Sequence, residues 1–480
     1  MRTEKDLLGE RELPAEVYYG IHTLRAMENF PLTGQRMHPA LIRALAMVKK
    51  AAAEANRDLG FLPPDIGDAI ILAAEEVMQG KWLDQFPVDA LQGGAGTSAN
   101  MNINEVLANR AIELLGGEKG DYRVVHPLEH VNKHQSTNDV CPTAIRVAAI
   151  ELLRPVSEAC ARLQEELQYK ESEFAGIIKM GRTQLQDAVP IMLGQEFSAY
   201  AQAIGRDRWR IYKVEERLRQ VNLGGTAVGT GLNAERKFIF LANEKLRNIA
   251  RMGVARAENM IDITQNADVF VEVSGLLKAL AVNITKIAND LRLLASGPRA
   301  GLAEIHLPER QAGSSIMPGK VNPIIPEALN QISFQVMSND LAITLGAQAG
   351  QLELNAMLPL VAHNLLQSLT ILRNGMEVFI KHCIKGITAN EEVCRGTVEK
   401  SYGLITALTP HIGYDRATEV AKTVAGGDKN VRTVVLEMGL LNAEELEIVL
   451  NPWEMTKPGI AGQKTMHGGG EVREKGRIHD

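Results

Sequence analysis

The stretch from residue 143 to residue 171, TAIRVAAIELLRPVSEACARLQEELQYKE, decides the fold class of this chain. Apolar residues recur along it at helical spacing, at Ile145, Ala149, Leu152, Val156, Leu163 and Leu167. A helix of about 30 residues is roughly 45 Å long, whereas an average helix has about 11 or 12 residues. A helix this long with a broad apolar face predicts a bundle, packed against other long helices and against other subunits.

The same spacing returns between about 264 and 296, at Val273, Leu277, Leu280, Ile284, Ile287, Leu291 and Leu294. Similar long segments are expected at about 193–221, 324–348 and 360–388. Shorter helical patterns are expected at about 41–58, 65–79 and 99–115. No β-alternation stands out, so the sequence predicts a mainly α protein.

The end of the chain has the pattern of a smaller helical unit. Asn442 followed by Glu445 forms a capping box, which predicts a helix of about 443–450. Pro452 and Pro458 then break the chain, and the tail around 468–470, a run of three glycines among mixed charges, is expected to be disordered.

The composition limits both the core and the partners. A chain of 480 residues is too long for one hydrophobic core, so we expect two or three domains. Only 4% of residues are aromatic, so Ala, Leu, Val and Ile must fill the core, which suits packed helices. The net charge of −6 gives no reason to expect binding to nucleic acid or to an anionic membrane. An anionic substrate therefore requires a local positive site.

The cysteines and the N-terminus indicate a cytoplasmic protein. Four cysteines, Cys141, Cys160, Cys383 and Cys394, are widely spaced without a CxxC pair. This is neither a zinc pattern nor a disulfide framework, so we interpret them as small apolar core residues in a reducing compartment. The charged first residues lack the apolar region of a signal peptide. No run of about 18 apolar residues could span a bilayer.

Four polar loops, 93–98, 135–139, 181–187 and 313–323, interrupt the helical pattern. Their side chains are neutral hydrogen-bonding groups with one lysine as the cation. The candidate residues are Thr97, Ser136, Thr137, Asn138, Thr183, Gln184, Ser314, Ser315, Lys320 and Asn322. Such a set can hold a small dicarboxylate through many hydrogen bonds.

Each loop also has a purely structural interpretation, and the residues alone leave both open. Residues 313–323, with two glycines and two prolines, could be a flexible connector. Residues 93–97 match a phosphate cradle only weakly, and they could equally form a turn in which Thr97 or Ser98 caps a helix. Residues 136–138 could cap the long helix that follows, and a helix start that is capped can still bind an anion. Thr183 and Gln184 alone would be ordinary loop residues.

Three histidines, His126, His130 and His134, are spaced four residues apart. This spacing could place them on one helical face as metal ligands. Pro127 and the polar surroundings argue against that, and no HExxH pattern is present. We expect instead that these histidines form supporting hydrogen bonds or subunit contacts.

The segment 313–323, GSSIMPGKVNP, resembles the signature of the fumarase/aspartase superfamily. The other three loops match that superfamily in the same order, and the resemblance covers nearly the whole chain except about its last dozen residues. Within the superfamily, YYGIHTLRA at 18–26 and GRTQLQD at 181–187 resemble the aspartate ammonia-lyases. Pro326-Glu327 and Asn330-Gln331 resemble them as well.

Gln184 departs from one pattern of the family. Fumarases and some aspartases have a histidine there, which pairs with a glutamate at the position of Glu327. Gln184 can only donate or accept neutral hydrogen bonds. Because other aspartases also have glutamine there, the departure argues against a fumarase.

The resemblance implies a mainly α subunit of three domains, 1–136, 137–392 and 393–480, whose central long helices form a twenty-helix core in a homotetramer. Each active site would combine loops from three subunits. The resemblance implies no required cofactor, and it leaves activation by a divalent metal open.

The implied reaction is the reversible elimination of ammonia from L-aspartate to give fumarate, through an aci-carboxylate. By resemblance, Ser314 is the general base. Thr97, Ser136, Thr137 and Ser315 stabilise the charge that develops on the β-carboxylate. Thr183, Gln184, Lys320 and Asn322 would hold the α-carboxylate, and Asn138 the amino group. The alternatives are a class II fumarase and, more remotely, a non-catalytic structural relative.

Overall fold

The computed structural model describes residues 1–466 and divides the chain into two compact units. Unit 1 is made of Met1–Ala161, Gly205–Thr285 and Ala328–Glu377. Unit 2 is made of Arg162–Ile204, Lys286–Glu327 and the chain from Val378 onward. The tail expected to be disordered lies outside the described residues. The three-domain division stays a prediction, because these units are split along the long helices.

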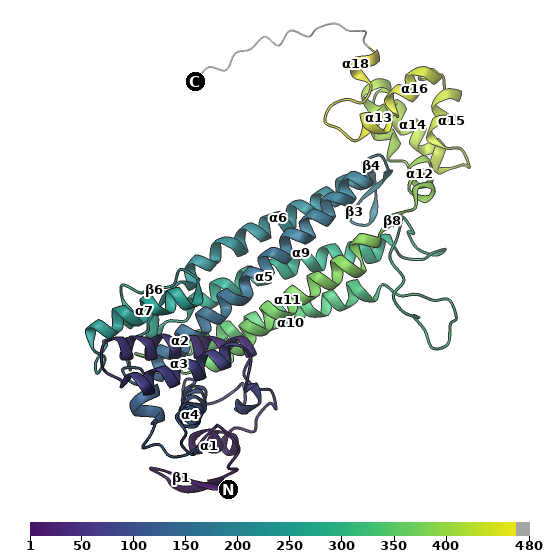
Figure 1. Ribbon diagram of the computed structural model, residues 1–480. Helices are drawn as coiled ribbons and strands as arrows, with labels where there is room; N and C mark the ends of the chain where they lie inside the picture. Colours follow the sequence, from purple (N-terminus) through teal and green to yellow (C-terminus); the bar gives the residue numbers. More distant parts are fainter. Residues whose placement is uncertain (467–480) are drawn as a thin grey trace, which may run out of the picture. The chain divides into compact units, whose positions relative to one another are not determined.

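Five long helices dominate the structure, as the apolar periodicity predicted (Figure 1). They are α5 (Thr137–Glu173), α6 (Leu193–Leu218), α9 (Asp268–Leu294), α10 (Ile324–Gln348) and α11 (Leu358–His382). With 37 residues, α5 is about 55 Å long. It begins six residues before the stretch quoted above, because its first turn is polar and carries no apolar repeat.

Within unit 1 these helices are joined by polar contacts as well as by apolar packing. Ser274 of α9 donates to Asp340 of α10 at 2.8 Å, and Asn339 of α10 donates to the Ser368 hydroxyl of α11 at 3.0 Å. The thiol of Cys160 on α5 contacts the sulfur of Met376 on α11. All four cysteines are buried and unpaired, which confirms their interpretation as core residues.

The rest of unit 1 consists of shorter elements. They are β1 (Arg2–Asp6), β2 (Gly9–Leu13), α1 (Ile21–Asn29), α2 (Pro39–Asp58), α3 (Pro64–Met78), η1 (Leu83–Gln85), α4 (Thr97–Leu114), η2 (Pro127–Val131), β5 (Gln220–Val221), α7 (Arg236–Ala250), β6 (Ala255–Arg256) and α8 (Met260–Gln265). Helices α2, α3 and α4 confirm the shorter predicted helices. Alanines fill the buried side of α2, which lets α3 and α7 pack closely against it.

Unit 2 contains one hairpin, a small two-stranded pairing and the C-terminal helices. Its further elements are β3 (Ile178–Thr183), β4 (Gln186–Met192), β7 (Ile305–His306), η3 (Ile384–Gly386), β8 (Thr388–Ala389), α12 (Glu391–Lys400), α13 (Leu404–Ile412), α14 (Tyr414–Ala425), α15 (Val431–Glu437), α16 (Ala443–Val449), α17 (Pro452–Met455) and α18 (Gln463–Met466). Both hydrogen bonds of the predicted capping box are present at the start of α16. An apolar core that includes Met180, Val420 and Val435 joins the hairpin to these helices.

The strands are the main departure from the predicted pattern. The loop expected at 181–187 is the end of the antiparallel hairpin β3–β4. Its tip residues, Gln184 and Leu185, both have left-handed backbone angles, with φ of 55° and 64°. A two-residue hairpin turn requires such angles. Its usual sequence signal is Asn-Gly or Asp-Gly, and residues 184–185 have neither.

Candidate active site

The first part of the candidate site is the start of helix α4. Gly94, Ala95 and Gly96 have φ of 82°, 57° and 93°, and this left-handed run turns the chain into the helix. Gly96 is the N-cap and has no side chain to cap with, so the alternative in which Thr97 or Ser98 caps this helix is wrong. Thr97 is instead the first helical residue, with an exposed side chain whose hydroxyl donates to the Gly94 carbonyl at 2.7 Å.

The second part is the start of helix α5. The Ser136 hydroxyl accepts the N–H of Asn138 at 3.2 Å, and the Asp139 carboxylate accepts the N–H of Ser136 at 3.1 Å. This reciprocal pair confirms that the 136–138 segment caps the helix. It also fixes Ser136, Thr137 and Asn138 at the positive end of a 37-residue helix.

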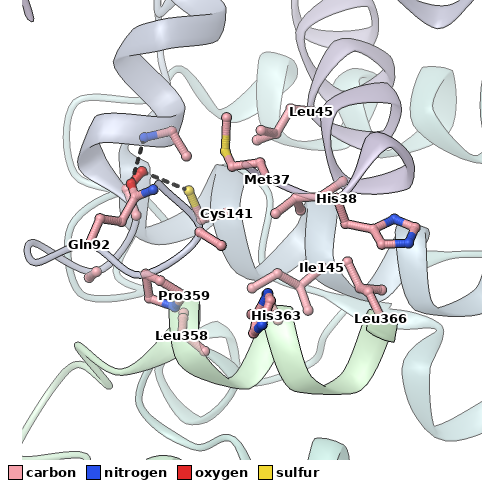
Figure 2. Close-up of a pocket in the computed structure, with 16 residues that line it drawn as sticks. Met37, His38, Leu45, Gln92, Cys141, Ile145, Leu358, Pro359, His363 and Leu366 are labelled. Atoms are coloured by element: carbon pink, nitrogen blue, oxygen red, sulfur yellow. Dashed lines mark hydrogen bonds between the residues drawn. The ribbon is translucent and has the colours of Figure 1, made fainter. Parts of the chain in front are cut away.

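These two helix starts lie against each other. The Asn100 amide in the first turn of α4 donates to the Thr137 hydroxyl of α5 at 3.2 Å. The Cys141 thiol of α5 donates to the Gly96 carbonyl at 3.4 Å. The side-chain oxygen of Gln92 accepts the N–H of Ala99 at 2.8 Å. Figure 2 shows this contact and the Cys141–Gly96 contact at the edge of an apolar pocket. Two converging helix N-termini with hydroxyl side chains make a site suited to an anion.

A third segment, the glycine-rich loop from 222 to 234, completes this part of the site and was not singled out from the sequence. Its Gly224 and Thr226 donate N–H groups to the Asp139 carboxylate at 3.1 and 2.9 Å. Its Ala227 carbonyl accepts the Asn138 amide at 2.8 Å. The available signal was four glycines within eight residues, at Gly224, Gly225, Gly229 and Gly231.

Asp139 anchors this arrangement from inside the protein. Its side chain is fully buried, and burial raises the pKa of the carboxyl to about 6. The three N–H donors act in the opposite direction and lower that pKa. Because the donors come from both sides of the site, one buried carboxyl holds the α5 cap and the 222–234 loop together.

In unit 2, Thr183 and Gln184 are exposed at the tip of the β3–β4 hairpin. The base of this hairpin is fixed by a buried ionic cluster. Glu304, which is fully buried, pairs with Lys179 at 3.1 Å and with Arg182 at 2.8 Å. Lys179 also pairs with Glu196 of α6 at 2.8 Å.

The loop at 313–323 is closed at its neck. The N–H of Gly313 donates to the Lys320 carbonyl at 2.7 Å, and the Asn322 amide donates to the Gly313 carbonyl at 2.7 Å. A side chain at Gly313 would meet the Lys320 carbonyl at 2.7 Å, so only glycine fits there. The segment is therefore a shaped loop and not a flexible connector.

Ser314 lies just inside this neck. Its Oγ accepts the N–H groups of Ile316 at 3.2 Å and of Met317 at 3.0 Å. Hydrogen bonds of this kind favour an alkoxide over a hydroxyl. Ser315 and Lys320 lie on the exposed part of the same loop.

Glu327 lies at the start of α10, just after this loop. Its carboxylate lies 3.6 Å from the Arg292 guanidinium of α9. The chain thus provides a cation for this glutamate without a histidine at position 184.

With this geometry in view, the comparisons with known proteins assign the family. The model of a lyase family matches residues 9–338, and that of the fumarase C C-terminus matches residues 404–457. The chain belongs to this lyase family. An aspartate ammonia-lyase from a Bacillus species is 54% identical over 464 residues, 97% of this chain and 99% of that protein. The aspartate ammonia-lyase of Escherichia coli strain K12 is 49% identical over 97% of this chain and 98% of that protein.

Two solved structures resemble the lyase chain over nearly its whole length. The fumarate lyase:delta crystallin from Brucella melitensis bound to cobalt has a TM-score of 0.92 and 49% identity, covering 95% of this chain and all of that chain. The class II fumarase from Schistosoma mansoni has a TM-score of 0.90 and 36% identity, covering 95% of this chain and 98% of that chain. These similarities confirm the mainly α fold predicted from the sequence.

The structure groups the predicted site residues of the lyase into two sets. Unit 1 brings Thr97, Ser136, Thr137 and Asn138 to two adjoining helix N-termini. Unit 2 carries Ser314, Ser315, Lys320 and Asn322 on one closed loop, and Thr183 and Gln184 on the hairpin tip. Their individual roles stay predictions.

The three histidines of the lyase form local hydrogen bonds. His126 accepts the N–H groups of Leu128 and Glu129 and so begins the short helix η2. The His130 ring accepts the N–H of His126 at 2.9 Å, and the His134 ring lies 2.7 Å from the Asn56 side-chain oxygen. Within residues 1–466, no group of three His, Cys, Asp or Glu side chains is arranged to hold a metal ion.

Proposed function

We propose that this lyase is an aspartate ammonia-lyase, which eliminates ammonia from L-aspartate to give fumarate. The observation that carries the proposal is the convergence of two helix N-termini around the hydroxyls of Thr97, Ser136 and Thr137. The curated aspartate ammonia-lyases are 47–54% identical over at least 95% of the chain, which supports the same substrate. A class II fumarase is not favoured, since the class II fumarase from Schistosoma mansoni is 36% identical to this chain.

Removal of a carbon-bound proton beside a carboxylate creates an aci-carboxylate with two negative charges on one group. Donors that are already in place for this charge supply the largest part of such catalysis. Ser136 and Thr137 meet that requirement, because their hydroxyl oxygens accept N–H groups of the protein and leave the O–H able to donate. The Thr97 hydroxyl donates to the Gly94 carbonyl, and in this proposal it turns from that carbonyl to the substrate. Ser315 adds a fourth hydroxyl in this proposal.

Ser314 is the proposed general base. A serine hydroxyl is a weak base unless its alkoxide is stabilised. The N–H groups of Ile316 and Met317, which already donate to its Oγ, support this role. Lys320 on the same loop adds a positive charge and, with Asn322, Thr183 and Gln184, holds the α-carboxylate.

Asn138 is proposed to hold the amino group that leaves. Its NH₂ group donates to the Ala227 carbonyl at 2.8 Å, which directs the side-chain oxygen away from that contact. A carbonyl oxygen is the end of an amide that an ammonium group can bind. The fixed orientation of the Asn138 side chain therefore suits an ammonium group better than a carboxylate.

We further propose a homotetramer in which each active site combines loops from three subunits. Apolar side chains on the long helices support this, since Val282 of α9 and Phe334, Leu341 and Leu345 of α10 are each at least half exposed. Four buried, unpaired cysteines support a cytoplasmic location. No helix among the described residues is long and apolar enough to cross a membrane.

The proposal also includes no required cofactor, because hydroxyl, amide and ammonium groups supply all the roles assigned above. Dialysis against a chelator should leave turnover of L-aspartate within about twofold. A loss that added divalent metal restores would contradict this part of the proposal.

The function is tested by following the loss of fumarate absorbance with and without ammonium. Loss that requires ammonium supports the ammonia-lyase, whereas equal loss in its absence would identify a fumarase. Ser314→Ala should keep the fold and lower kcat by about 10²- to 10⁴-fold, the usual contribution of general base catalysis. Ser172→Ala, which removes an exposed hydroxyl from α5, is the matched control. Near-normal turnover by Ser314→Ala would refute the assignment of the base.

A further inference from the structure

A buried lysine lies directly behind the anion site of unit 1, and the mechanism above does not use it. Lys49 is on α2, and its side chain is fully buried. Its Nζ donates to the Asn132 side-chain oxygen at 2.9 Å and to the Gln135 side-chain oxygen at 3.0 Å. A buried ammonium is costly unless nearby groups compensate for its lost hydration, so its presence requires a reason.

The partners of Lys49 lead to the substrate-facing residues within two hydrogen bonds. The Asn132 oxygen also accepts the Asn100 amide at 3.1 Å. That Asn100 amide donates to the Thr137 hydroxyl at 3.2 Å as well. Gln135 immediately precedes the capping residue Ser136. Lys49 therefore supports both helix starts from one buried point.

Two titratable groups act on the pKa of Lys49, the carboxyl of Asp139 and the thiol of Cys141, and both raise it. The oxygens of Asp139 are occupied by the N–H groups of Ser136, Gly224 and Thr226. Burial lowers the pKa of Lys49 to about 7, and the charge of Asp139 partly offsets that effect. A dianion bound in front of this site would favour the protonated form of Lys49.

We propose that Lys49 is a positioning residue of the anion site, which orders the 135–138 segment through Asn132 and Gln135 and places a positive charge behind the bound carboxylate. This inference rests on the proposed function for the identity of the anion. It assigns to a buried residue on α2 a role that the two polar loops of unit 1, 93–98 and 135–139, do not fill. Those loops contribute only neutral donors to the site, whereas L-aspartate carries two carboxylates and one ammonium group.

The test compares Lys49→Gln with Lys50→Gln. Glutamine at 49 keeps an NH₂ donor and removes the charge. Lys50 is the next residue on the same helix, and it pairs with Glu75 at 2.6 Å, so its variant is a matched loss of one cation. The measurements are kcat and KM for L-aspartate and the dissociation constant of succinate, a dicarboxylate that cannot react.

Lys49→Gln should weaken succinate binding at least tenfold and lower kcat at least tenfold, because the charge on the β-carboxylate grows in the transition state. Lys50→Gln should remain within twofold of the wild type. A folded Lys49→Gln variant that binds succinate within twofold and keeps its kcat would overturn the proposal. Because succinate binding needs no turnover, the role of Lys49 can be tested even if the chain does not act on aspartate.

If Lys49→Gln does not fold, calorimetry of the wild-type protein gives the answer. Succinate binding near pH 8, measured in buffers of different ionisation enthalpy, should show uptake of protons. Binding without any proton uptake between pH 7 and 9 would overturn the proposal.

Discussion

Replacing Gly96 by alanine tests whether the start of α4 is as tightly constrained as the structure indicates. Gly96 has φ of 93°, and a Cβ there would lie 2.9 Å from the Cys141 sulfur. The backbone conformation costs a residue with a side chain about 1–2 kcal/mol. The close contact adds about 1–3 kcal/mol, as overpacking of a dense core does. Gly96→Ala should therefore lower the free energy of unfolding by about 2–5 kcal/mol.

The assay is urea unfolding followed by circular dichroism at one protein concentration, with kcat measured on the same samples. We expect kcat to fall as well, because Thr97 follows Gly96 directly at the helix start. The contact can be separated from the backbone cost by repeating the substitution in a Cys141→Ala background. There the loss should shrink by about 1–3 kcal/mol, which leaves the backbone contribution. An unchanged unfolding free energy for Gly96→Ala, or an equal loss in both backgrounds, would refute the reasoning.

Two further substitutions test buried contacts of carboxylates, one in unit 1 and one at the base of the hairpin in unit 2. Glu105→Gln should lower the unfolding free energy by about 1–3 kcal/mol. The buried carboxylate of Glu105 accepts the N–H groups of Gly20, His22 and Thr23. In the glutamine variant, the NH₂ group would face at least one of these donors. A urea midpoint equal to that of the wild type would contradict this prediction. Lys179→Met should lower the unfolding free energy by about 1.5–3 kcal/mol, because the buried Glu304 loses one of its two cations and keeps Arg182. The same variant should also raise KM for aspartate in steady-state kinetics. An unchanged KM would show that the position of the hairpin does not affect substrate binding.

The long helices could be predicted because their signal is repeated many times. In α9, apolar residues mark the same face over seven positions, so an error at one position changes little. The hairpin β3–β4 could not be predicted in this way. Its turn residues, Gln184 and Leu185, have no preference for left-handed angles. The turn is held instead by tertiary contacts such as the ion pair between Arg182 and Glu304. These two residues lie 122 residues apart in the chain.

The site shows the same division between local and distant signals. The four loops could be selected because their glycines, hydroxyls and one lysine stand out against helical neighbours. Lys49 could not be selected, because it lies in an ordinary helical pattern beside Lys50. Only the fold distinguishes the two, since Lys49 is fully buried against Asn132 and Lys50 pairs with Glu75.

The charge balance of unit 1 explains why a buried lysine belongs behind its two helix starts. A protein with a net charge of −6 must attract an anionic substrate through local charge. The N-termini of α4 and α5 together supply about one positive charge. Lys49 adds one positive charge when protonated and the buried Asp139 removes one when ionised, so unit 1 offers roughly one positive charge. In the proposed reaction, L-aspartate brings two carboxylates and one ammonium group, and loss of the carbon-bound proton adds one negative charge to the β-carboxylate. Donors and charge that unit 1 holds in place before this step stabilise the transition state more than the bound substrate, and so they raise kcat.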